Sequence, residues 1–376
     1  MNARVILAGL CVVLGAAIAA AQEAPVEAPR PLIEVAILLD TSNSMDGLIE
    51  QAKTQLWTMV NQFIAMRRAG VRPELHVALY EYGKPSLGAG EGYIRQIVPL
   101  STDLDRVSQE LFALKTNGGD EYCGQVIKSA VEGLKWSERA SDLKVILIAG
   151  NEPFTQGTVD FRVSCKAAAT KGIIVNTIHC GTCEEGVNGK WKEGADLADG
   201  TYLWIDQNQK VAAIAAPQDA EIAKLGVEMN ATYVAYGKRG NEGADRQAAQ
   251  ETNAASAGAS APTERAVAKS SDNYQNEGWD LVDVVRAKKV KVEEVKAEDL
   301  PEPMRKMTAD EKKAYVDVQQ NKRNEIQKKI QDLGAARNAY IAEERKKQAE
   351  KGPETFDSAV IKTVREQASR KEFKTE

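Results

Sequence analysis

The sequence is poor in histidine, since only His76 and His179 occur among its 376 residues. Histidine is the side chain that most often moves protons near neutral pH, so this scarcity leaves little material for acid–base catalysis. The sequence also places no histidine or lysine where it would activate the hydroxyl of Ser42 or Ser44 as a nucleophile. We therefore expect a protein that is not an enzyme.

Signatures of nucleotide and nucleic acid binding are also absent. Gly83, Gly88, Gly90 and Gly92 lie between two expected strands and do not open a helix, as the glycines of a phosphate-binding loop do. Lys and Arg together number 49 and Asp and Glu number 54, so the net charge is -5. A chain without excess positive charge carries no electrostatic footprint for nucleic acid, and we expect no such partner.

Long apolar runs are confined to the N-terminus. Arg4 precedes an apolar run over residues 5–19, and small residues at 19–21 offer a cleavage site before Gln22. This pattern predicts a signal peptide over residues 1–21, with a retained membrane anchor as the alternative, although the run is short for a full span. We expect export to the periplasm or cell surface, with no transmembrane segment after cleavage.

Export leaves four cysteines, because Cys11 lies within the signal peptide. An even number of cysteines in an oxidising compartment predicts two disulfides, whose pairing the sequence does not determine. The candidates are Cys123, Cys165, Cys180 and Cys183.

The pair Cys180 and Cys183 allows two other interpretations. A Cys-x-x-Cys pair can exchange disulfides when the pKa of one thiol is lowered, which would make the protein a thiol-disulfide oxidoreductase. The acidic Glu184 and Glu185 that follow disfavour a thiolate and argue against the start of a helix at this point. The second interpretation is a zinc site. Its ligands would be His179, Cys180, Cys183 and Cys123.

Apolar periodicity is the strongest feature that is present. Residues 35–39 are aliphatic throughout, which predicts a strand buried on both faces. Further strands are expected at 75–82, 93–100, 143–149, 173–178 and 201–205. Helices are expected at 46–68, 103–115, 122–136, 158–171 and 211–229. The alternation predicts a doubly wound α/β fold with a six-stranded, mainly parallel sheet, in which the strand at 93–100 is an antiparallel edge strand.

The first strand ends in Asp40, Ser42 and Ser44, whose oxygens can converge on a hard cation. Ligands of open α/β sheets bind outside the carboxyl ends of the strands, where these residues stand. This Asp-x-Ser-x-Ser pattern resembles the metal-ion-dependent adhesion site of von Willebrand factor type A (VWA) domains. The resemblance implies a Rossmann-like VWA domain over residues 33–235.

Members of that family take further ligands from two other loops, a threonine before the third helix and an aspartate after the fourth strand. In this sequence Asp120 stands at the expected position of the threonine, and Gly150 stands where the aspartate should be. The resemblance therefore implies a variant site in which Asp40 and Asp120 supply the two carboxylates, and Asn151 or Glu152 a further oxygen.

Such a site would hold Mg²⁺, Mn²⁺ or Ca²⁺. A carboxylate in the second loop makes the bound cation less electrophilic. The site would therefore bind the acidic side chain of a protein partner only weakly. The alternative is a metal-free domain in which Asp40, Ser42 and Ser44 cap the first helix.

The rest of the chain is charged and less regular. Residues 237–272 are rich in Ala, Gly, Ser, Asn and Gln, which predicts a low-complexity linker. Residues 279–376 are expected to form a charged helical region. Thr308 and Glu311 resemble a capping box that opens a helix reaching residue 348, and a shorter helix at 356–373 would fold back on it as a hairpin or weak coiled coil. The expected apolar seam is Ile326, Ile330, Leu333 and Tyr340, broken by Arg337.

Together these features also resemble exported bacterial proteins of the VWA superfamily with no assigned activity. The leading hypothesis is an exported, non-enzymatic module that binds a protein partner through a divalent cation. Its C-terminal helices would provide self-association or a second contact. The alternatives are the thiol-disulfide oxidoreductase and a structural protein with a metal-free VWA fold.

Overall fold

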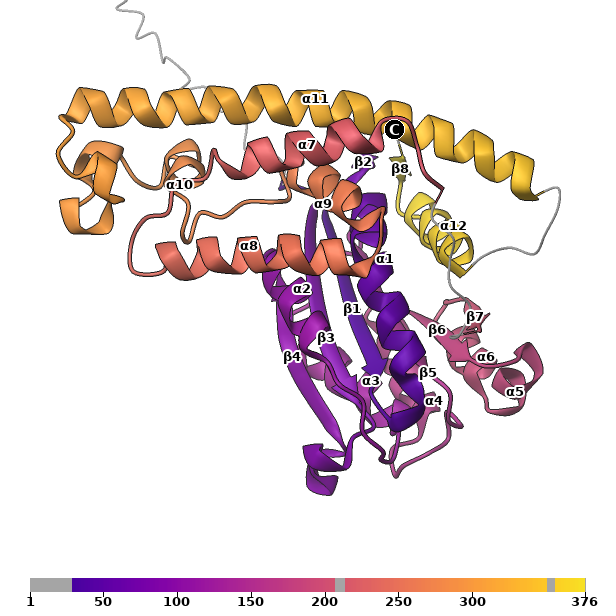
Figure 1. Cartoon of the computed structure of the whole chain (residues 1–376). Coiled ribbons are helices and arrows are strands. Elements are labelled where there is room, and N and C mark those ends of the chain that lie inside the picture. Colours follow the sequence, from indigo (N-terminus) through magenta and orange to yellow (C-terminus); the bar gives the residue numbers. More distant parts are fainter. Residues whose placement is uncertain (1–28, 207–213, 350–355, 376) are drawn as a thin grey trace, which may run out of the picture.

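The computed structural model describes residues 29–206, 214–349 and 356–375. The predicted signal peptide lies outside these residues. Figure 1 shows a central sheet flanked by helices, with a layer of further helices packed across one end of it. Within the described ranges, no helix combines the length and apolar character needed to cross a membrane.

The sheet has six strands in the order β4-β3-β1-β5-β6-β7, and all neighbours are parallel except β3 and β4. The predicted doubly wound fold with one antiparallel edge strand is therefore confirmed. The strands are β1 (Leu32–Asp40), β3 (Glu74–Tyr82), β4 (Ile94–Ser101), β5 (Leu143–Gly150), β6 (Ile174–Cys180) and β7 (Tyr202–Ile205).

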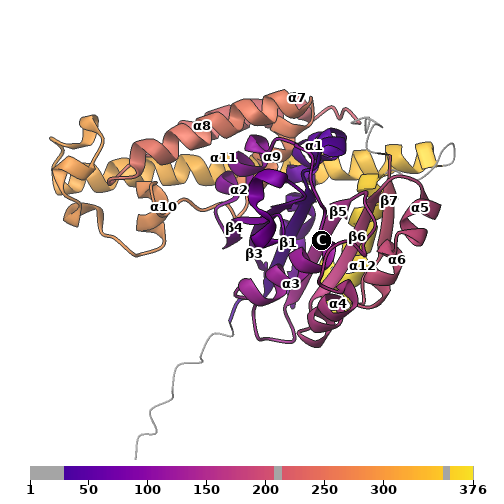
Figure 2. The same ribbon diagram turned by 90° about the horizontal axis from the view of Figure 1, so that it is seen from below.

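Helices cover both faces of this sheet, as Figure 2 shows with α1 and α2 on one side and α3 and α4 on the other. Side chains of β1 alternate between the two cores, with Val35 and Ile37 on one face and Ala36 and Leu38 on the other. The helices are α1 (Asp46–Ile64), α2 (Leu104–Ala113), α3 (Cys123–Gly133), α4 (Phe161–Thr170), α5 (Cys183–Asn188) and α6 (Trp191–Asp196). Short 3₁₀ turns lie at Asn43–Met45, Pro85–Leu87, Ala89–Glu91, Val292–Glu294, Ala297–Asp299 and Glu302–Met304.

The first helix ends earlier than its apolar pattern predicts. After α1 stops at Ile64, the chain forms β2 (Met66–Arg68), which pairs antiparallel with β8 (Phe373–Thr375). This contact comes from residues far along the chain, so the local pattern carries no sign of it.

The segment predicted as a linker is folded instead. It forms α8 (Gly240–Ala257) and α9 (Ala261–Lys269), which lie between α7 (Asp219–Asn230) and the sheet domain in Figure 1. Its small side chains permit close packing, since Ala266 and Ala268 are almost fully buried. The prediction missed this because the apolar content is low and much of the buried surface is charged.

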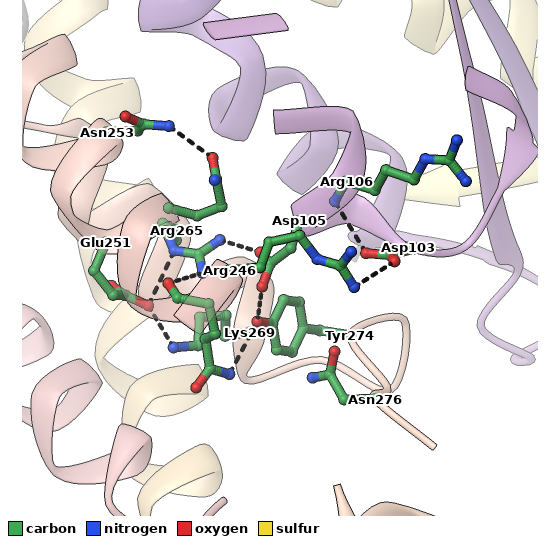
Figure 3. A network of polar contacts seen from close by, with 12 residues as sticks. Asp103, Asp105, Arg106, Arg246, Glu251, Asn253, Arg265, Lys269, Tyr274 and Asn276 are labelled. Carbon is green, nitrogen blue, oxygen red and sulfur yellow. Dashed lines mark hydrogen bonds and ion pairs between the residues drawn. The ribbon is translucent and has the colours of Figure 1, made fainter. Parts of the chain in front are cut away.

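A buried network of charges joins these helices to the sheet domain, as Figure 3 shows. Arg265 of α9 contacts Asp105 of α2 at 2.6 Å and Glu251 of α8 at 3.0 Å. Lys269 contacts the same Glu251 at 2.6 Å, and the Tyr274 hydroxyl donates to Asp105 at 2.6 Å. Burial lowers the pKa of Lys269 to about 8, although the charge of Glu251 acts in the opposite direction.

The long C-terminal helix also packs within the chain. A short α10 (Leu281–Arg286) precedes α11 (Ala309–Ala349), and the expected capping box is confirmed because Thr308 and Glu311 exchange hydrogen bonds. Ile326 and Ile330 are buried against α7 and α9, and Arg337 bonds to carboxylates of these same helices. The predicted hairpin between the two C-terminal helices is therefore wrong, because α11 packs on α7 instead. The last helix, α12 (Phe356–Ser369), contacts β7 and α1 instead.

Candidate functional site

Asp40 stands at the carboxyl end of the central strand β1 and is fully buried. Its Oδ1 accepts a hydrogen bond from the Ser42 amide at 2.8 Å, whereas its Oδ2 has no partner among the described residues. Burial raises the pKa of Asp40 to about 7, and the charge of Glu152 acts in the same direction. The Ser42 side chain and the Asn151 backbone amide act to lower this pKa, so they lie near the carboxylate without forming a hydrogen bond to Oδ2.

The second carboxylate beside Asp40 belongs to Glu121 and not to Asp120. Glu121 is buried, and burial raises its pKa to about 8, with further contributions from the charges of Asp40 and Glu152. A Cβ built on Gly83 would lie 2.8 Å from Asp40 Oδ1 and 3.0 Å from Glu121 Cγ, so the two side chains converge above this glycine.

Asp120 is exposed, and its charge acts on Tyr93. The sequence-based assignment was displaced by one residue, because the loop before α3 turns the side chain of Glu121, and not that of Asp120, towards Asp40. Asp120 and Glu121 are adjacent and both acidic, so the sequence carries no signal that would have identified Glu121.

The third loop cannot supply a carboxylate from position 150. A Cβ at Gly150 would lie 2.6 Å from Tyr82 Oη and 3.0 Å from Asp40 Oδ2. The Tyr82 hydroxyl fills this space and donates to the Ala149 carbonyl at 2.9 Å. Glycine at this position is therefore matched to a tyrosine on β3, a partner that the sequence pattern did not reveal.

Hydroxyl and amide oxygens complete the edge of the site. Ser42 Oγ is buried, and neither it nor Asn151 Oδ1 has a hydrogen-bond partner in the part of the chain that the structure describes. The Asn151 amide donates to Ser44 Oγ at 3.1 Å, which joins the first and third loops. The Ser42 hydroxyl makes no capping hydrogen bond at the turn that follows it, so helix capping does not account for this residue.

Gln156 links the second and third loops, a role that the sequence analysis missed. Its Oε1 accepts a hydrogen bond from the Glu121 amide at 3.0 Å, and its Nε2 donates to Glu152 Oε2 at 3.3 Å. The Trp191 indole donates to the Glu152 carbonyl at 2.9 Å. These bonds hold Glu121 and Glu152 on the same side of the sheet edge as Asp40.

The donor set fits a hard cation. Asp40, Glu121, Ser42 and Asn151 offer only oxygen, which suits Mg²⁺, Mn²⁺ or Ca²⁺ and not zinc. Across residues 29–206, 214–349 and 356–375, no group of three or more His, Cys, Asp or Glu side chains has metal-binding geometry. A cation here would therefore depend on hydroxyl, amide and water oxygens besides the carboxylates.

The four cysteines in the described part of the chain are free thiols, in contrast to the two predicted disulfides. Cys123 and Cys165 belong to the core under α3 and α4, whereas Cys180 belongs to the core on the opposite face of the sheet. The sheet therefore separates Cys180 from both of them. Cys183 is exposed at the start of α5.

The geometry also tells against a reactive Cys180. Burial raises the pKa of this thiol far above its usual range, and the charge of Asp40 adds to the effect. A helix does begin at Cys183, contrary to expectation, because Thr182 and Glu185 form a capping box. His179 is buried, and its ring nitrogens have no hydrogen-bond partner within the described ranges.

Comparison with known proteins gives one family match. Residues 34–196 match the family model of the von Willebrand factor type A domain. The conserved hypothetical protein BatB from Bacteroides thetaiotaomicron is 20% identical, with 46% of this chain and 90% of that chain covered and a TM-score of 0.36. The SpRpn10 VWA domain is 17% identical, covering 48% of this chain and 100% of that chain, with a TM-score of 0.35. No curated protein matches the chain.

Proposed function

We propose that the protein is a non-enzymatic binding module, because residues 34–196 match the von Willebrand factor type A domain, a type that commonly mediates protein interaction. It is exported to the periplasm or cell surface and holds a divalent cation at the carboxyl edge of its sheet. The apolar run at 5–19 with its small-residue cleavage site supports export.

The observation that supports the cation is the group of buried oxygens without partners. Asp40 Oδ2, Ser42 Oγ and Asn151 Oδ1 all lack a hydrogen bond in the described structure. An unsatisfied buried polar group costs about 1–3 kcal/mol, so three at one sheet edge would be destabilising without a ligand. A single Mg²⁺, Mn²⁺ or Ca²⁺ with its water would satisfy them together.

The partner would approach the cation with an acidic side chain, as a further oxygen ligand. Asp40 and Glu121 already place two carboxyl groups at this point, which neutralise a divalent ion when both are ionised. The added carboxylate therefore gains little electrostatic energy, and the contact is weak and readily reversed. Apolar and polar contacts around the rim would then carry more of the affinity.

Titration calorimetry of the mature chain, residues 22–376, with Mg²⁺, Mn²⁺ and Ca²⁺ tests the metal. We expect saturable binding that Asp40→Asn or Glu121→Gln weakens at least about tenfold, since each removes a charged ligand. Asp120→Asn is the matched control, because it removes an exposed carboxylate next to Glu121 and should leave binding unchanged. The absence of binding heat at millimolar metal would contradict the proposal and would favour the alternative, a VWA fold that binds no metal.

The partner contact is tested separately by affinity capture on the mature chain with and without EDTA. A contact made through the cation must weaken when the metal is chelated and return when Mg²⁺ is added back. Equal capture in both conditions would show that the partner binds elsewhere, for example through the C-terminal helices.

A further inference from the structure

A second concave site lies at the opposite edge of the sheet, next to the amino ends of the strands. Its volume is about 640 Å³, and it is formed by the connection from α3 to β5, the end of α4 and the turn before β8. Lys135, Lys144, Lys171 and Lys371 line it, with Trp136 in the wall. Glu138 is the only acidic residue in its described lining, although the whole chain has a net charge of -5.

Backbone carbonyls hold three of these lysines in place. Lys144 Nζ donates to the carbonyls of Ser137 at 3.0 Å and Lys171 at 2.6 Å. Lys171 Nζ donates to Val131 O at 2.9 Å, and Lys371 Nζ donates to Ala140 O at 2.8 Å. An ammonium group has three N–H donors, so each of these lysines keeps at least one for a ligand.

The positive charge of the cavity is not neutralised by ion pairs. In the ranges that the structure describes, none of the four lysines pairs with a carboxylate within 4.0 Å, whereas Lys84 and Lys269 do. Burial lowers the pKa of Lys144; Glu34 and Asp142 oppose this effect, while Lys171 and Lys371 add to it.

The two carboxylates that act on Lys144 are already engaged by other donors. Glu34 accepts a hydrogen bond from the Ser137 amide at 2.8 Å, and Asp142 accepts from the Ser137 hydroxyl and from Arg139. The carbonyls at the ends of α3 and α4 oppose an anion, but Lys171 and Lys144 already bind carbonyls there. The remaining N–H donors of the lysines therefore have no acceptor among the residues that the structure describes, and a ligand with several negatively charged oxygens would supply one for each of them.

We propose that this lysine-lined cavity is a binding site for a compact polyanion that carries phosphoryl groups. The lysines fix such a ligand as point charges, and Trp136 contributes an aromatic side chain to the cavity wall. The site is independent of the cation at the other edge of the sheet, so binding should persist in EDTA.

Calorimetry with inorganic pyrophosphate in EDTA tests the proposal. The variant Lys135→Gln/Lys171→Gln should weaken binding at least about tenfold, because it removes two charged donors. Lys128→Gln/Lys166→Gln is the matched control, since these exposed lysines lie on α3 and α4, the helices that precede Lys135 and Lys171, but outside the cavity. Thermal unfolding checks that each variant folds, and Lys135→Gln alone gives a second reading that leaves the Lys171 to Val131 bond intact.

Two sources of phosphoryl groups are distinguished by vesicle sedimentation. Binding to phosphatidic acid vesicles but not to phosphatidylcholine vesicles, with loss in the cavity variant, would assign the site to a lipid headgroup. Pyrophosphate binding without vesicle binding would assign it to a soluble phosphate ester. The proposal is overturned if neither probe binds saturably, or if the control variant loses as much affinity as the cavity variant.

Discussion

At the residue scale, the geometry around Asp40 depends on how Tyr82 and Gly150 fit together. The tyrosine hydroxyl lies where a side chain at position 150 would begin, and it is buried against Asp40 and the Ala149 carbonyl. This arrangement leaves Glu121, beside Asp40 Oδ1, to provide the second carboxyl group. A single hydroxyl thus determines which loops can provide ligands.

Gly150→Ala should destabilise the protein by about 1–3 kcal/mol, because the added methyl group overlaps Tyr82 Oη. Urea unfolding measures the change. Gly90→Ala is the control, since a Cβ at that position meets nothing within 4 Å. Adding Tyr82→Phe to Gly150→Ala should restore part of the loss, and an unchanged double variant would show that the overlap is not the cause.

Single residues also show where sequence reasoning stops. Asp40, Ser42 and Ser44 were placed correctly at the end of β1, because an aliphatic run followed by polar residues has a clear boundary. Asp120 and Glu121 are adjacent and both acidic, so only the direction of each side chain distinguishes them. That direction is set by packing of the loop on Gly83, which no local pattern encodes.

At the scale of elements, α8 and α9 are held to α2 by charge more than by apolar contact. Arg265→Met should destabilise the protein by about 3–5 kcal/mol, because Asp105 would remain buried without its partner. Arg162→Met is the control, since its ion pair with Glu193 is largely exposed and should contribute at most about 1 kcal/mol. Equal losses in urea unfolding would contradict the importance of the network.

The same network predicts how stability depends on pH. The folded chain releases the Lys269 proton near pH 8, whereas the group in the unfolded chain keeps it up to its ordinary pKa of 10.5. Between these values the unfolded state binds more protons, so the free energy of unfolding should rise as the pH increases from 8 towards 10. Lys269→Met should remove this rise in urea unfolding at a series of pH values, and an unchanged slope would exclude Lys269 as its origin.

The elements that the sequence predicted best are those whose side chains all make the same kind of contact, with an apolar core. Strands such as β1 and β5 are buried on both faces, so their aliphatic runs match their lengths to within a few residues. The segment 237–272 was taken for a linker because its burial depends on Arg265 and Lys269, residues that are usually exposed. These two residues of α9 pair with Asp105 of α2 and Glu251 of α8. The pairs join residues far apart in the sequence, so only the three-dimensional structure reveals them.

At the scale of the whole molecule, the C-terminal segment fastens onto the sheet domain. Gln367 of α12 and Asn176 of β6 exchange two side-chain hydrogen bonds, at 3.0 Å and 2.6 Å, in a buried position. Val360 and Val364 of the same helix join the core that also contains residues of α1. The C-terminal helix therefore belongs to the body of the molecule.

Gln367→Leu should destabilise the whole molecule by about 1–3 kcal/mol, because it leaves the Asn176 amide buried without an acceptor. Glu366→Leu, at the adjacent exposed position, is the control and should change the free energy of unfolding by less than about 0.5 kcal/mol. Urea unfolding followed by circular dichroism compares the two. Similar values would indicate that α12 is not firmly docked.

The pairing of β2 with β8 has a consequence for biosynthesis. Residues 66–68 emerge early in translation, but their strand partners at 373–375 emerge only after nearly all the other described residues. Until then, the nascent chain exposes an unpaired backbone edge and the apolar surface that α12 later covers. The β2–β8 pair therefore forms only after synthesis has passed residue 375, so the last step of folding follows the translation of the sheet domain.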